Sequence, residues 1–213
     1  MKFTRLLDIV QDEPVFDTGL LLAGDEDPKD VRRQLSRWAK AGRLYQLRRG
    51  LYALAPRFQK VKPHPFVVGN RLIQPSYVSV QSALAHYGLI PEYVPVTTSV
   101  TTQRPARWST PLGEYQFRHI KTDLFRGYSL VSLAAGQQAF VATPEKALLD
   151  LIHLTPRSDS PYYLEELRLQ KLDRLDLGAL EHEGELANSP KLRRAARFVA
   201  ELARAEAEEY ETL

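Results

Sequence analysis

Residue types that carry catalysis or bind metals are scattered in this chain of 213 residues. Because it contains no cysteine, thiolate metal sites, iron–sulfur clusters, cysteine nucleophiles and disulfides are excluded. The five histidines show no metal-ligand spacing; they are His64, His86, His119, His153 and His182. The P-loop, GxGxxG, HExxH and GxSxG motifs do not occur. We therefore expect no enzyme activity, no cofactor and no metal.

The basic residues favour a different chemistry, the binding of a polyanion. The formal net charge is only +3, but it is unevenly distributed along the chain. Residues 29–62 contain eleven basic residues and one acidic residue, a local charge of +10, whereas residues 1–28 carry −5 and residues 63–213 carry −2. Clustered cations gain free energy by displacing counterions from phosphates, so this basic block indicates nucleic-acid binding.

The first half of the basic block has the pattern of an amphipathic helix. Asp27 and Pro28 are typical of an N-cap and a first helical position, and Gly42 is typical of the residue after a helix end. At about 100° per residue, the apolar residues fall on one stripe: Val31, Leu35 and Trp38. The other side is cationic or polar: Lys29, Arg32, Arg33, Ser36, Arg37 and Lys40. A solvated helix face usually alternates Glu with Lys, but Asp30 is the only acid here.

Two shorter helices are expected before this helix and a hairpin after it. Residues 43–54 place apolar residues on both sides of two arginines and a glycine, which predicts a two-stranded hairpin. Apolar spacing predicts a helix over residues 3–11 and a shorter one over about 18–23, capped by Asp17. Helix, helix, cationic helix and hairpin are the order of a winged helix-turn-helix, which we predict for residues 1–55.

In a winged helix-turn-helix, the third helix enters the DNA major groove and the wing contacts the backbone or the minor groove. The candidate DNA contacts on the helix are Lys29, Arg32, Arg33, Ser36 and Arg37. Those on the wing are Arg48 and Arg49. A nuclease site is not indicated, because no Glu-x-Lys triplet occurs and the single Asp-x-Lys is the helix cap at Asp27. Use of the same module to dock a protein stays open as an alternative.

The rest of the chain predicts a linker and a larger domain. Residues 56–64 are rich in proline and basic residues, which is typical of an extended linker, and residues 65–213 predict a mixed α/β domain with a helical tail over 156–213. Its expected helices are 65–73, 79–87, one from 144, one through 163–172 and one from Pro190. Its expected strands are 94–102, 114–121, 128–133 and 138–142. Ser79 and Thr143 have the pattern of helix caps. The predicted fold class is α+β.

A second, smaller basic patch is a candidate in the larger domain. It comprises Arg104, Arg107 and Arg118. Neighbouring strands also carry exposed cations that recognise nothing, so the role of this patch stays open.

Membrane association is not indicated. No window reaches the roughly 18 apolar residues that a membrane span needs, and acidic residues interrupt the apolar start of the chain. We expect a cytoplasmic protein.

Three segments together suggest a family. They are the predicted winged-helix segment, SYVSVQSALAHYGLIPEYVPVTTSVTTQRPARW and FVATPEKALLDLIHL. In order and spacing they resemble the AbiEi family, the antitoxins and predicted transcriptional regulators of abortive-infection (type IV) toxin–antitoxin systems, which act in phage defence. The resemblance covers about residues 1–155.

The resemblance implies a winged-helix repressor that binds inverted repeats in its own promoter. It also implies a larger domain that helps to neutralise a nucleotidyltransferase toxin, often without a stable complex. The implied DNA contacts map onto Lys29, Arg32, Arg33, Arg37, Arg48 and Arg49. The nucleotidyltransferase signature of the toxin is absent, which favours the regulator half of such a pair.

The first hypothesis is thus a sequence-specific repressor of double-stranded operator DNA that acts as an antitoxin; direct contact with the toxin stays open. The alternative is a solitary winged-helix regulator, or a protein-interaction module, without a toxin. A nuclease-like DNA-modifying enzyme has the least support in the sequence.

Overall fold

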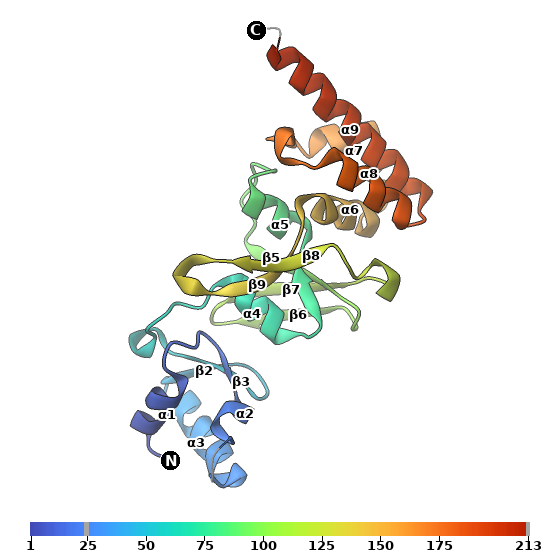
Figure 1. Ribbon diagram of the computed structural model, residues 1–213. Helices are drawn as coiled ribbons and strands as arrows, with labels where there is room; N and C mark the ends of the chain where they lie inside the picture. The colour runs from blue at the N-terminus through green and yellow to red at the C-terminus, as the bar shows by residue number, and fades with distance from the viewer. Residues whose placement is uncertain (24–25, 212–213) are drawn as a thin grey trace.

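The computed structural model describes residues 1–23 and 26–211. It is a mixed α/β structure with two sheets, which agrees with the predicted α+β class. Figure 1 shows an N-terminal part at one end, a six-stranded sheet in the middle and a group of helices at the C-terminal end. The last two residues of the predicted tail, 212–213, lie outside the described residues.

Among its described residues, the N-terminal part contains three helices and a small antiparallel sheet. Its elements are α1 (Phe3–Val10), β1 (Phe16–Asp17), α2 (Thr18–Leu21), α3 (Pro28–Lys40), β2 (Leu44–Arg48) and β3 (Leu51–Leu54). Strand β3 lies between β1 and β2. The three predicted helices and the hairpin are present, whereas β1 is too short to show a period in the sequence. The predicted cap is wrong, because Asp17 precedes α2 but its carboxylate pairs with Arg71 instead.

The middle of the molecule is a sheet with the strand order β6-β7-β5-β4-β9-β8. Its strands are β4 (Ser76–Val78), β5 (Val96–Thr101), β6 (Ala106–Thr110), β7 (Gly113–His119), β8 (Tyr128–Ser132) and β9 (Gln138–Ala142). The pairs β4–β9 and β5–β7 are parallel, and the other pairs are antiparallel. The four predicted strands are present as β5, β7, β8 and β9. The edge strand β6 was not predicted, because none of its residues is fully buried and its apolar signal is weak.

Helices cover both faces of this sheet. Helix α4 (Pro65–Leu72) lies toward the N-terminal part, and α5 (Val80–Tyr87) and α6 (Pro144–Leu154) lie toward the C-terminal helices (Figure 1). All three were predicted. Gly88 ends α5 at a φ of 70°, a conformation that favours glycine. The Thr143 hydroxyl caps α6 by accepting the N–H of Lys146 at 3.2 Å, as predicted.

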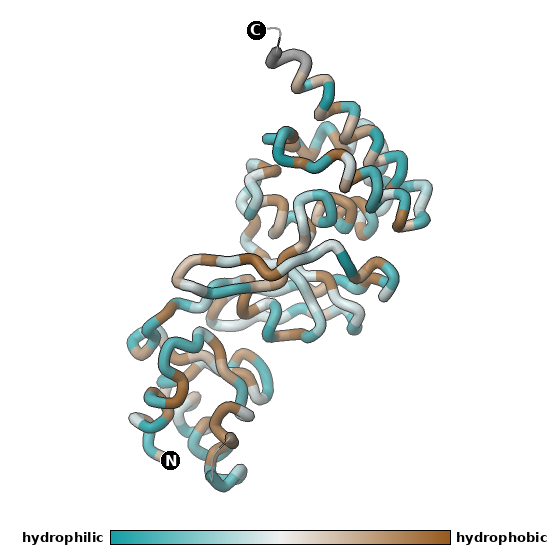
Figure 2. The backbone as a smooth tube through the Cα atoms, viewed as in Figure 1, coloured by the Kyte–Doolittle hydropathy of each residue, from teal (hydrophilic) through white to brown (hydrophobic). Residues whose placement is uncertain are grey.

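The C-terminal helices are α7 (Pro161–Glu166), α8 (Leu177–Leu186) and α9 (Pro190–Glu211). Both α8 and α9 pack on α6, and α7 packs on α9. Hydrophobic and hydrophilic residues alternate with the turns of α9 (Figure 2), the pattern of a helix buried along one side. The single helix predicted through residues 163–172 is wrong: α7 ends at Glu166, a 3-10 turn occupies Leu172–Arg174, and α8 was not predicted. The other 3-10 turns are Pro56–Phe58, Thr122–Leu124 and Ala134–Gly136.

One hydrophobic cluster joins the N-terminal part to the sheet and α4. Its N-terminal members are Val15, Leu47, Leu51 and Ala53, and its other members are Val68, Leu72, Tyr115 and Phe117. All eight are buried. Whether residues 56–64 separate two independent domains stays a prediction, but the parts that they connect pack directly on each other.

A second feature of the fold is a buried polar cluster between the sheet and α6. Lys146 and Asp150 form an ion pair in which each side chain is at most 6% exposed. The Asp150 carboxylate also accepts hydrogen bonds from the hydroxyls of Tyr77 (3.0 Å) and Ser79 (2.7 Å). Ser79 stands at the N-cap position of α5 but its hydroxyl makes no cap, so that prediction is wrong. Burial raises the pKa of Asp150, and the charge of Lys146 acts in the opposite direction.

We expect Asp150→Ala to lower the free energy of unfolding by about 3–5 kcal/mol, because it leaves the Lys146 ammonium buried without its counter-charge. The matched control is Glu181→Ala, which removes an exposed ion pair with Arg204 and should cost less than about 1 kcal/mol. Urea unfolding of both variants measures the difference. Equal losses would contradict the assigned role of the buried pair.

Acid should also destabilise the protein by protonating His64. Its Nδ1 accepts the N–H of Phe66 at 3.2 Å and so caps α4, which requires the neutral ring. Burial, followed by the nearby His86, lowers the pKa of His64. Because the folded-state pKa lies below the unfolded value, this stability is present above pH of about 6.5 and is lost as the pH falls below it. The His64→Asn variant keeps a capping acceptor that does not titrate. Between pH 7.5 and 5.5, the melting temperature of this variant should therefore fall less than that of the unsubstituted protein. An equal fall in both proteins would contradict this role.

Candidate nucleic-acid interface

Helix α3 is held at both ends by the residues that the sequence indicated. The Asp27 carboxylate accepts the N–H groups of Lys29 (2.7 Å) and Asp30 (3.1 Å), and Pro28 occupies the first turn. After the helix, Gly42 takes a φ of 64°. The predicted stripe is buried in the N-terminal core: Val31, Leu35 and Trp38. Burial of this stripe fixes which side of the helix faces solvent.

The solvent side of α3 carries the predicted contact residues. All of them are exposed: Lys29, Arg32, Arg33, Ser36 and Arg37. Within the part of the chain that the structure describes, Arg33 is the only cation of α3 in an ion pair, with Asp30 at 2.6 Å. Both partners are more than half exposed, so this pair is worth less than about 1 kcal/mol and a phosphate can replace Asp30. The helix therefore presents an accessible cationic surface.

The two arginines of the hairpin, Arg48 and Arg49, have different surroundings. Arg49 is exposed in the turn between β2 and β3. Arg48 is half-buried, and its guanidinium donates to the main-chain carbonyls of Arg71 (3.3 Å) and Arg49 (3.2 Å). The Gly50 carbonyl in the same turn accepts the N–H of Thr18, which joins the hairpin to the start of α2. Arg49 is thus the exposed cation of the hairpin, and Arg48 connects the hairpin to α4.

Arg43 was not among the predicted contacts, although it lies in the basic block. It follows α3, is exposed, and its guanidinium lies over the Phe3 ring at 5.1 Å from the centroid. The position of this cation directly after the helix and before the hairpin could have indicated it. It extends the exposed cations from α3 toward α1.

The three arginines of the second basic patch are not all free to bind a ligand. Arg104 and Arg107 are exposed, at the approach to β6 and on β6. The half-buried Arg118 of β7 donates to the Leu154 carbonyl at 2.9 Å, at the end of α6. A cation there satisfies a helix C-terminus, which accounts for Arg118 without a ligand.

Neither a metal site nor a membrane-spanning helix is found among the described residues. Among residues 1–23 and 26–211, no group of three or more His, Asp or Glu side chains is arranged to hold a metal ion. Within the same residues, no helix is both long and apolar enough to cross a membrane. The cationic surface on α3 is therefore the candidate that the fold positions most clearly.

Comparison with known proteins gives no match, either to a protein-family model or to a curated protein. The fold and the surface define a mixed α/β protein with an exposed cationic helix in its N-terminal part. The AbiEi resemblance stays a prediction that rests on the sequence segments alone.

The different surroundings of the two hairpin arginines lead to a stability prediction. Arg48→Ala removes a donor to two carbonyls and should lower the free energy of unfolding by about 1–2 kcal/mol. Arg49→Ala removes an exposed side chain and should change it by less than about 0.5 kcal/mol. Thermal or urea unfolding measures both. Equal effects would show that Arg48 does not hold the hairpin against α4.

Proposed function

We propose that the N-terminal part is a winged helix-turn-helix that binds double-stranded DNA, with α3 in the major groove. In support, three helices are followed by a two-stranded hairpin, and β1 completes a small sheet. Helix α3 has 13 residues, a length of about 20 Å, and it presents its polar side to solvent. The β2–β3 hairpin takes the place of the wing.

A single observation carries the proposal: one helix buries its apolar stripe in the core and exposes every predicted contact residue on its other side. Arginine and lysine side chains on such a helix reach guanine edges and phosphates, and Ser36 adds a short hydrogen-bonding group. Arg49 and Arg43 are also exposed and suit contact with the flanking DNA backbone.

We further propose that the protein represses its own operon, through inverted repeats, as an AbiEi-type antitoxin. The order and spacing of the sequence segments support this, and the absence of catalytic motifs in the sequence fits a regulator. The functional partner would be a nucleotidyltransferase toxin. A neighbouring nucleotidyltransferase gene would favour the antitoxin role, and a solitary gene would favour a plain regulator.

DNA binding can be measured by fluorescence anisotropy on the promoter region upstream of the gene, at several salt concentrations. Arg33→Ala and Arg37→Ala should each weaken binding, and each lost phosphate contact should reduce the salt slope by about 0.9. Arg49→Ala should act in the same way through the wing. The matched control is Arg204→Ala, which removes one exposed cation from α9 and should change neither quantity.

Each alternative gives a different result. Unchanged affinity and unchanged salt slope in all three variants would contradict the proposed interface. Absence of promoter binding at physiological salt would favour a protein-interaction module. Cleavage of the DNA after addition of magnesium would favour an enzyme.

A further inference from the structure

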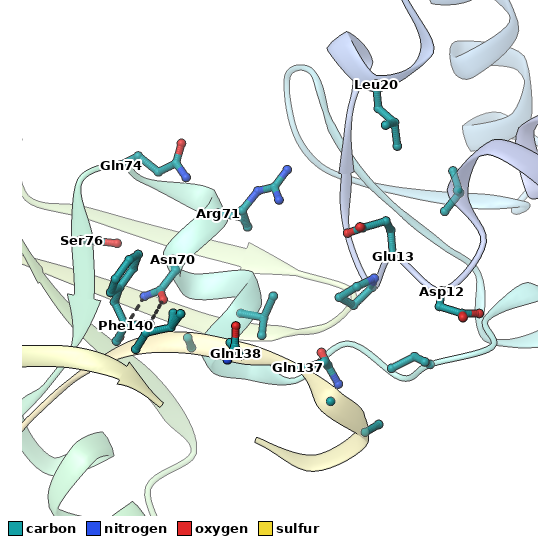
Figure 3. Close-up of a pocket in the computed structure, with 18 of the residues that line it drawn as sticks. Asp12, Glu13, Leu20, Asn70, Arg71, Gln74, Ser76, Gln137, Gln138 and Phe140 are labelled. Atoms are coloured by element: carbon teal, nitrogen blue, oxygen red, sulfur yellow. Dashed lines mark hydrogen bonds between the residues drawn. The ribbon is translucent and has the colours of Figure 1, made fainter. Parts of the chain in front are cut away.

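A groove lies between the N-terminal part and the six-stranded sheet. It has a cavity volume of about 1110 Å³. One wall is formed by residues 9–14, at and after the end of α1, and by Leu20 of α2; the other is formed by α4 and by the β8–β9 hairpin. Figure 3 shows Leu20 and Glu13 on one side of this space and Gln138 and Phe140 on the other. The volume is at least that of a pocket for a small organic molecule, about 300–1000 Å³.

Apolar side chains that are exposed to solvent converge on this groove. Six large apolar side chains are exposed among the described residues, and three of them line the groove: Leu20 (41%), Leu130 (51%) and Phe140 (45%). Leu130 and Phe140 are cross-strand partners on β8 and β9, so they project from the same face of the sheet. Tyr128 extends this surface, with its ring edge-to-face to Phe140 at 5.8 Å between centroids. Residues from distant parts of the chain thus give the groove apolar surface on both of its walls.

Polar groups also line the groove. The exposed side chains of Gln74 and Gln138 make no hydrogen bond within the described residues, so their amides are available to a ligand. Asn70 differs, because its amide exchanges two hydrogen bonds with the main chain of Phe140 and fixes the wall of the groove.

The charges of the lining favour a ligand that is not anionic. Asp12 pairs with Lys60 at 3.4 Å, and Arg71 pairs with Asp17. Among the described residues, Glu13 is the one charged side chain of the lining without an ion pair. Its carboxylate repels a polyanion and attracts a cation, so the groove is not a continuation of the DNA-binding surface.

From these observations we infer that the groove binds a small organic molecule, uncharged or cationic, with an aromatic or aliphatic body. The body packs on Leu20, Leu130 and Phe140. The glutamine amides bond its polar groups, and Glu13 pairs with a cationic group. None of the proposed DNA contacts lines this site, and the inference does not depend on them.

Three dyes test the site on the intact protein by fluorescence titration: cationic rhodamine 6G, uncharged Nile red and anionic anilinonaphthalene sulfonate. Rhodamine 6G should bind at one site, in the micromolar range, and more tightly than the anionic dye. Leu130→Ser and Phe140→Ser should each weaken rhodamine 6G and Nile red by about tenfold or more, because each removes apolar contact area. Glu13→Gln should weaken rhodamine 6G and leave Nile red unchanged.

The matched control is Leu186→Ser, since Leu186 is also 51% exposed but lies on α8, away from the groove. It should change no dye affinity. The substituted groove residues are exposed, so an unchanged melting temperature confirms that each variant is folded. No saturable binding of any dye, or equal binding by all variants, would overturn the proposal. Conversion of a dimer to a monomer by Leu130→Ser, without loss of dye binding, would instead show that a second copy covers this face.

Discussion

The apolar contact between the N-terminal part and the six-stranded sheet is the interaction on which the rest of the arrangement depends. Leu47 and Leu51 of the hairpin meet Val68 and Leu72 of α4 in one buried cluster. Burial of the eight apolar side chains of this cluster stabilises the contact, because their surface is removed from water. The connector at residues 56–64 therefore joins surfaces that are already in contact, and α3 has a fixed orientation relative to the sheet.

This contact also decides which cations face solvent. The hairpin lies against α4, so Arg48, at the end of β2, is within reach of the Arg71 carbonyl, while Arg49 in the turn stays exposed. Arg71 itself reaches in the other direction and pairs with Asp17, next to α2. Two adjacent arginines in the sequence thus differ, since Arg48 holds the hairpin in place and Arg49 is exposed to solvent.

The features that could be predicted from the sequence have local causes. The Asp27 carboxylate caps the start of α3, Gly42 after its end takes a positive φ, and the Thr143 hydroxyl caps α6 by accepting a neighbouring N–H. The features that were missed depend on residues distant in the chain. Serine is a common helix cap, but the Ser79 hydroxyl instead donates a hydrogen bond to the Asp150 carboxylate, 71 residues away in the sequence. Likewise, nothing near Arg48 indicates that α4 will lie beside it. The groove could not be predicted for the same reason, since its lining comes from residues that lie far apart in the sequence.

Folding also redistributes the charge of the basic block. Acids from the first 28 residues neutralise cations that are not on the proposed DNA-binding surface: Asp12 pairs with Lys60 of the connector, and Asp17 pairs with Arg71 of α4. Arg48 is turned toward main-chain carbonyls. Helix α3 keeps its cations exposed, with one weak ion pair among them. Because exposed charges act over only about 8–10 Å at physiological salt, this local distribution decides where a polyanion binds, and the small net charge of the chain does not. The carboxylate of Glu13, which has no ion pair among the described residues, opposes the entry of a phosphate backbone into the groove, so the two surfaces differ in charge.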